Sequence, residues 1–94
     1  MKKFEHKKFG KLEVLDFTTK QYQEYSTRIE DAANKNFVVF RIELVKACLE
    51  LGMIKCEPEL TAEGVDSEKP NRVMWLADKT AEAIAEAVNI DPLD

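Results

Sequence analysis

Residues 37–52 read FVVFRIELVKACLELG, and this stretch decides the fold because it is apolar on nearly every side. Its only charged residues are Arg41, Glu43, Lys46 and Glu50. The β-branched start is compatible with a strand, but the length and the glycine at position 52 favour a helix over about 37–51. A helix this apolar lies either at the centre of a core or partly buried in an assembly. With two further helices and a hairpin to cover it, the centre of the core is the simpler position.

The segment before it predicts another helix, over about 19–33. Thr18 and Gln21 stand three residues apart, which is the spacing of a capping box. Tyr22, Tyr25 and Ile29 then recur at helical spacing, with polar residues between them. The polar run NKN at 34–36 ends this helix.

The N-terminal segment, KKFEHKKFGKLEVLDF, alternates weakly between apolar and polar residues. We predict strands near 3–8 and 11–16, joined by a turn in which Gly10 supplies a positive φ at no steric cost. A two-stranded hairpin is only marginally stable alone. We therefore expect it to pack on the helices.

The stretch MIKCEPELTAEGVDSEKPN, residues 53–71, is the longest irregular segment that we expect. It carries five acids between Glu57 and Glu68, and the default interpretation is a solvated acidic loop in which TAEG forms one short helical turn. Ser67 can cap a third helix, over about 68–89, with Pro70 in its first turn. Pro92 follows the end of that helix.

The third helix contains the only tryptophan of the chain, in RVMWLADKTAEAIAEAVNI, residues 72–90. Val73, Leu76, Ile84 and Val88 form its inward stripe, and Trp75 falls near the edge of that stripe. Trp75 therefore either covers the rim of the core or contacts a partner beyond it.

These elements predict a single α+β domain over residues 1–94 that is mostly helical. Its N-terminal β hairpin (about 3–16) packs on three helices (about 19–33, 37–51 and 68–89). A chain of 94 residues, 45% hydrophobic and 34% charged, has the composition of an ordinary globular domain. No apolar run approaches the roughly 18 residues that span a bilayer, and MKKFEHKKFG lacks the apolar region of a secretory signal. We expect a cytoplasmic protein without membrane contact.

Cys48 and Cys56 fit a reducing compartment, where we expect Cys48 to be a small buried hydrophobe. The sequence leaves a disulfide between them open. Neither belongs to a CxxC pair, and one histidine is too few to complete a zinc site, so we expect no metal and no cofactor.

Charge is distributed unevenly within the net charge of −4. Residues 1–11 carry five lysines against one glutamate, a net charge of +4. Residues 57–94 carry ten acids against three bases, a net charge of −7. Such a chain can dock head to tail with copies of itself or onto a basic partner, or its two ends can attract each other within one fold.

No catalytic arrangement is visible in the sequence. His6 lies among lysines without a nucleophile nearby, and Glu82 and Glu86 share a helix face without a third catalytic group. The basic arm KKFEHKK is outweighed by an acidic remainder that would repel phosphate, so we expect no nucleic-acid binding. The chain is expected to be a non-enzymatic binding protein.

The order of elements resembles that of a known family. A lysine- and aromatic-rich hairpin leads into DFTTKQYQEY, then come a strongly apolar helix, an acidic loop and VMWLADKTAEAI. This layout is similar to that of the small tail assembly chaperones of tailed phages and prophages. Their members begin with a short hairpin and enter the first helix through a Leu/Phe-Thr-x-x-aromatic turn.

The resemblance implies a role in virion assembly, in the cytoplasm of the host cell. Such chaperones bind the long helical tape-measure protein, the tail-tube subunit or both, and they tend to self-associate. An amphipathic helix of the partner would lie in an apolar groove. The residues that we expect to form this groove are Phe37, Phe40, Leu44, Met53, Trp75 and Leu76, since aromatic and methionine side chains are enriched at interface centres. For each of them the alternative is a place in the core, which is favoured for Leu44 and Leu76.

Two other functions remain open at this point. The chain is alternatively a permanent structural subunit of a virion or other complex. It is alternatively a small acidic inhibitor or regulatory protein that presents its loop to a basic surface.

Overall fold

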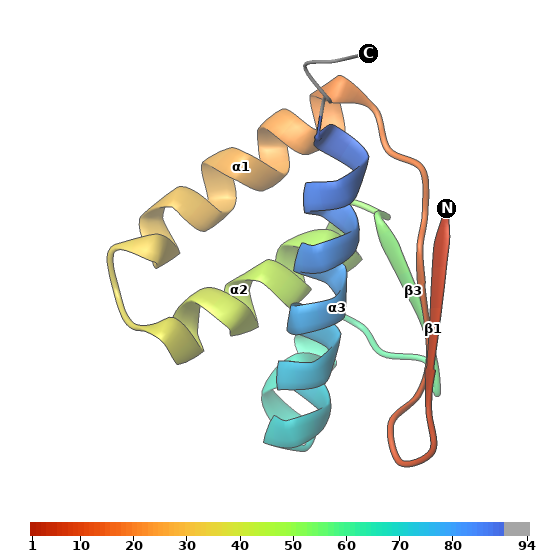
Figure 1. Cartoon of the computed structure of the whole chain (residues 1–94). Helices are drawn as coiled ribbons and strands as arrows, with labels where there is room; N and C mark the ends of the chain where they lie inside the picture. The colour runs from red at the N-terminus through yellow and green to blue at the C-terminus, as the bar shows by residue number, and fades with distance from the viewer. Residues whose placement is uncertain (90–94) are drawn as a thin grey trace.

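The computed structural model describes residues 1–89. It is an α+β fold in which a three-stranded antiparallel sheet packs against three helices, so the predicted fold class is confirmed. In chain order the elements are β1 (Lys2–His6), β2 (Gly10–Val14), α1 (Thr19–Ala33), α2 (Phe37–Glu50), β3 (Ile54–Glu57), the 3₁₀ helix η1 (Glu63–Ser67) and α3 (Pro70–Val88). Figure 1 shows the sheet on one side of the molecule and the helices on the other.

Local signals place α1 and α2. The Thr18 side chain accepts from the Gln21 backbone N–H, and the Gln21 side chain accepts from the Thr18 backbone N–H, so the predicted capping box is present. The Asn36 side chain accepts from the Val39 N–H and caps α2. Gly52 has a φ of +70° just after α2, which a glycine adopts without strain.

The sheet contains one strand more than the predicted hairpin. Residues 54–57 were expected to be irregular, but they form β3, which pairs antiparallel with β2 in the strand order β1-β2-β3. Within these four residues Ile54 and Cys56 are buried, and Lys55 and Glu57 are exposed. This alternation of apolar and charged residues is the only sequence signal for the strand. It covers four residues and merges into the acidic segment that follows.

The start of α3 differs from the prediction as well. Ser67 ends η1 and does not cap the helix; Lys69 occupies the N-cap position and Pro70 the first helical position. Proline at this position stabilises a helix start without a side-chain cap, because its fixed φ is helical and its missing N–H would have no partner. The expected helical turn at TAEG is present as η1, shifted by two residues.

The core lies where α2 meets the inner face of the sheet and α3. Its fully buried large side chains are Leu12, Leu44, Val45, Cys48, Met53, Leu76 and Thr80. Residues of α2 and α3 are close-packed against each other, and α1 also packs against α2. The apolar stretch at residues 37–52 therefore contains the central helix of the core, α2.

Candidate partner-binding site

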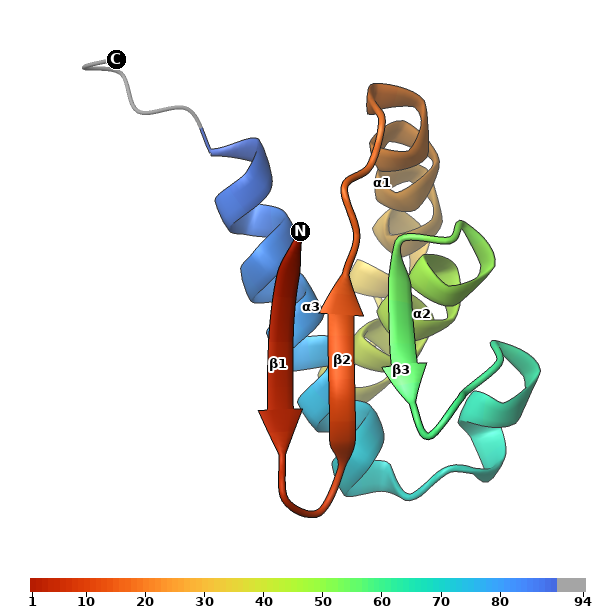
Figure 2. The same cartoon turned by 90° about the vertical axis from the view of Figure 1, so that its right-hand side faces the viewer.

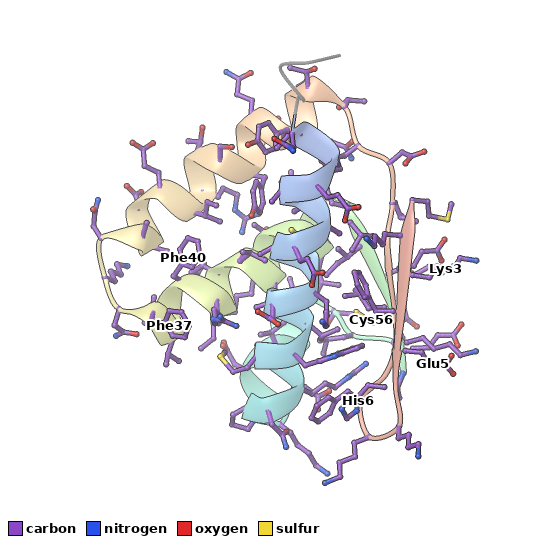
Figure 3. All side chains as sticks on the ribbon, in the orientation of Figure 1. Lys3, Glu5, His6, Phe37, Phe40 and Cys56 are labelled. Carbon is purple, nitrogen blue, oxygen red and sulfur yellow. The ribbon has the colours of Figure 1, made fainter. Side chains whose placement is uncertain are left out.

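The six residues predicted to form one groove do not lie on one surface. Leu44, Met53 and Leu76 have 1%, 0% and 0% of their surface exposed and belong to the core. Phe37 and Phe40 lie near the start of α2 (Figure 3), where Phe37 is 67% exposed and Phe40 half-buried. Trp75 packs elsewhere, against the hairpin. The spacing of apolar residues along a helix predicts which face of the helix is apolar, but it does not show which other element buries that face.

Trp75 fastens the hairpin to α3. Its ring lies 5.6 Å from that of His6 and 5.8 Å from that of Phe9, measured between centroids. His6 and Phe9 themselves stack at 4.3 Å, and Nδ1 of His6 accepts from the Lys8 backbone N–H at 3.0 Å. Aromatic pairs at these separations stabilise a structure beyond the area they bury. Trp75 is thus half-buried at the rim of the core, with two aromatic neighbours from the hairpin.

Arg72 connects the same end of the sheet to the acidic segment. Its guanidinium is buried, and its Nε donates to the Phe9 carbonyl at 3.1 Å. Its other two nitrogens donate to the Pro58 carbonyl and to Glu68, each at 2.6 Å. The backbone N–H of Lys69 and then the Arg72 guanidinium hold the pKa of Glu68 below its ordinary value. Arg72 therefore ties together the hairpin turn at Phe9, the segment after β3 at Pro58 and the residues before α3 at Glu68.

An open groove runs between α1 and α3. Both helices pack on α2, but they scarcely contact each other, and Figure 1 shows them diverging on the same side of α2. The residues that line the groove are Tyr22, Tyr25, Ser26 and Ile29 from α1, and Ala81, Ile84, Ala85, Val88 and Asn89 from α3. Most of these lining side chains are apolar.

The walls of the groove are shaped for close approach. On α3, Ala81 and Ala85 present only methyl groups, so that another backbone can come near. On α1, Tyr22 stacks on Tyr25 at 6.1 Å, and burial raises the pKa of the Tyr25 hydroxyl above its ordinary value. Both tyrosines present an aromatic ring with one polar atom, a combination that is common in interfaces.

An exposed apolar patch lies near one end of this groove. Phe37 and Val38 are 67% and 52% exposed, and the Arg41 guanidinium stacks over the Phe37 ring at 4.2 Å. Arg41 also contacts Asp78 of α3 at 3.8 Å. Since Asp78 stands three residues before Ala81, the pair joins the patch to the groove face of α3.

Part of the charge asymmetry is neutralised within the fold. Lys2 of the basic N-terminal segment contacts Glu86 of α3 at 2.6 Å, and the hydrogen bond to Glu86 raises the pKa of Lys2. In the acidic segment, Asp66 pairs with Lys46 at 2.9 Å, and Glu68 pairs with Arg72. The acids Glu57, Glu59 and Glu63 stay exposed.

Residues 1–89 contain neither a cluster of metal ligands nor a disulfide. No three His, Cys, Asp or Glu side chains in that range are close enough to hold a metal ion. Cys48 and Cys56 are both buried free thiols, so the disulfide left open by the sequence is not formed. None of the helices in that range has the length and apolarity needed to cross a membrane.

The fold and the groove define a small α+β protein with a helix-lined apolar surface. No protein-family model, no curated protein and no solved structure matches this chain.

Proposed function

We propose that this chain is a non-enzymatic tail assembly chaperone that binds an amphipathic helix of its partner in the groove between α1 and α3. The partner is the tape-measure protein or the tail-tube subunit of a tailed phage or prophage. The observation that carries the binding mode is the groove itself, whose two helical walls both pack on α2. A helix laid along it would complete a packed helical layer, as helix-in-groove complexes do.

The charges around the groove favour a partner helix with basic flanks. Asp78 and Glu82 are exposed beside the α3 wall, where they also contact Arg41 and Lys79, and Glu30 is exposed beside Ile29 on α1. A helix whose apolar face enters the groove and whose borders carry lysine or arginine would meet opposite charges on both sides. The exposed Phe37 and Val38 extend the apolar contact at one end.

The acidic inhibitor is the weaker alternative. It requires a free acidic loop, but Asp66 and Glu68 are engaged by Lys46 and Arg72. A permanent structural subunit would use the same groove, and it differs from a chaperone in staying with the finished particle.

The experiment is co-purification of the tagged chain from host cells during particle assembly, followed by mass spectrometry. We expect a tape-measure or tail-tube protein to be recovered with the wild-type chain and with Ala87→Arg, and to be lost with Ala85→Arg. Both alanines are exposed on α3, but only Ala85 lines the groove. We also expect the chain to be absent from mature particles.

Two outcomes would contradict the proposal in different ways. Equal recovery with both arginine variants would exclude the groove as the binding site. Presence of the chain in mature particles at fixed stoichiometry would exclude a chaperone and favour the structural subunit.

A further inference from the structure

The outer face of the sheet carries an ordered pattern of charges. Side chains on this face point away from the helices, as Lys3 and Glu5 do in Figure 3. The strand register aligns them in two rows across β1, β2 and β3, which are Lys3–Glu13–Lys55 and Glu5–Lys11–Glu57. Sign alternates along each row and also along each strand. Opposite charges directly across neighbouring strands stabilise a sheet, so the pattern supports the observed register.

The β1 edge of this sheet is open. Among the described residues β1 pairs with β2 alone, and Figure 2 shows no element in the plane of the sheet beyond it. The β3 edge also pairs with β2 alone, but the chain's own Glu59–Ala62 segment lines a depression beside it. An edge strand presents a row of backbone N–H and C=O groups to which another strand can bind.

We propose that β1 pairs antiparallel with β1 of a second copy of this chain, centred on Phe4, to form a continuous six-stranded sheet. In this register Lys3 lies opposite Glu5 of the second copy, and Glu5 lies opposite its Lys3. Each row of alternating charges then continues without interruption into the second sheet. The two-fold axis closes the assembly as a dimer, because each copy contributes the same β1 edge.

The charges on β1 select this register over its neighbours. A two-residue shift in one direction places Lys3 opposite Lys3 of the second copy, and a shift in the other places Glu5 opposite Glu5. A one-residue shift would turn the apolar inner side chains to the outer face. Lysines on an edge strand usually discourage pairing, but here Lys3 has an acid, Glu5, two residues away that a two-fold partner can match, and Lys2 is paired with Glu86 of its own chain.

The inner face agrees with the same arrangement. Phe4 is half-buried under β1, with Nζ of Lys79 lying 5.8 Å from its ring, and in the dimer it meets Phe4 of the second copy across the axis. Directly opposed aromatic side chains are a favourable cross-strand pair. Figure 2 shows α3 behind β1, so its copy would run antiparallel beside it. On α3, Lys79 and Glu82 supply one charge of each sign that the neighbouring copy of α3 could match.

The test uses charge reversals on the full chain, with association measured by light scattering after size exclusion and by native mass spectrometry. We expect the wild-type mass to rise with concentration from 10.8 kDa towards twice that value. Lys3→Glu and Glu5→Lys each place like charges opposite each other twice across the axis. Each should weaken dimerisation about tenfold or more. An equimolar mixture of the two variants restores opposite charges and should form the mixed dimer.

Lys55→Glu and Glu57→Lys are the matched controls. Each makes the same charge change against the same central-strand residue, Glu13 or Lys11, but at the far edge of the sheet. All four positions are exposed, and far-ultraviolet circular dichroism checks that the variants are folded. We expect both controls to dimerise like the wild type.

The proposal is overturned by any of three results: a wild-type chain that stays at the monomer mass at millimolar concentration, far-edge controls that lose the dimer as fully as the β1 variants, or a mixture that stays monomeric. Because the surface involved is not the groove, these results are independent of the proposed chaperone function.

Discussion

Replacing Gly10 tests the junction of the hairpin with β3. Its φ is +88°, and a Cβ at this position would lie 1.9 Å from the Glu57 carbonyl oxygen and 2.9 Å from Cδ of Pro58. Gly52 also has a positive φ, +70°, but a Cβ there would meet nothing within 4 Å. Alanine at either position therefore incurs the left-handed backbone cost, but only Gly10→Ala adds a collision with backbone.

The cost of the left-handed backbone and the cost of the collision can be estimated separately. A left-handed conformation costs a residue with a side chain about 1–2 kcal/mol, which we expect as the whole effect of Gly52→Ala. The collision at Gly10 is relieved only by moving β3 away, which opens the Lys11–Glu57 end of the β2–β3 ladder and loses a backbone hydrogen bond worth about 1 kcal/mol. It also disturbs the Arg72 contacts to Phe9 and Pro58. We expect Gly10→Ala to destabilise the protein by about 3 kcal/mol in total.

Urea denaturation followed by circular dichroism measures both free energies of unfolding on the same scale. In a domain of this size the difference between the variants corresponds to a melting temperature lower by roughly 5–15 °C for Gly10→Ala. If Gly10→Ala and Gly52→Ala were equally stable, the close approach of β3 to the hairpin would be refuted.

Three further predictions concern the residues around the core. Trp75→Ala should destabilise the fold by about 2 kcal/mol in urea denaturation and leave partner binding intact, because Trp75 packs against the hairpin; loss of binding at unchanged stability would show that it faces a partner. Cys48 and Cys56 should react with a thiol reagent at pH 8 only after unfolding, since burial raises the pKa of Cys48 to about 12 and that of Cys56 above its ordinary value; fast labelling of the native chain would contradict this. The ionised Glu68 side chain stabilises the fold above its unfolded pKa, near 4.5, and this contribution is lost as the pH falls through the lower native pKa. Glu68→Gln should therefore reduce the free energy of unfolding at pH 7 and make its decline below pH 4.5 shallower. Parallel curves of unfolding free energy against pH for the two proteins would be inconsistent with the lowered pKa.

Sequence patterns predicted those parts of the fold that depend on neighbouring residues. The capping box of Thr18 and Gln21 and the glycine at position 52 act over three or four residues, and they marked the ends of α1 and α2 to within one residue. The strand β3 was missed because four residues give only two inward positions, and its stability comes from pairing with β2, which lies forty residues earlier. Long-range pairing of this kind leaves little local signal.

The candidate site shows the same division. Helical spacing correctly indicated that Tyr22, Ile29 and Ile84 share faces with core residues. It could not show that α1 and α3 stay apart on α2, which is what leaves their facing sides open. The residues of the predicted groove were chosen because they are large and apolar. Leu44 and Leu76 are buried by elements distant in the sequence, and this burial depends on the tertiary structure alone.

The central claim is that a partner helix binds between α1 and α3, and a nuclear magnetic resonance titration tests it most directly. The isotope-labelled chain is titrated with a purified helical fragment of the protein that co-purifies with it. We predict that the perturbed amide signals belong to residues 22–29 of α1 and 81–88 of α3, with Phe37 and Val38 at one end. Perturbations confined to the acidic segment 57–68 would contradict the account, as would saturation of the complex without any change along the groove.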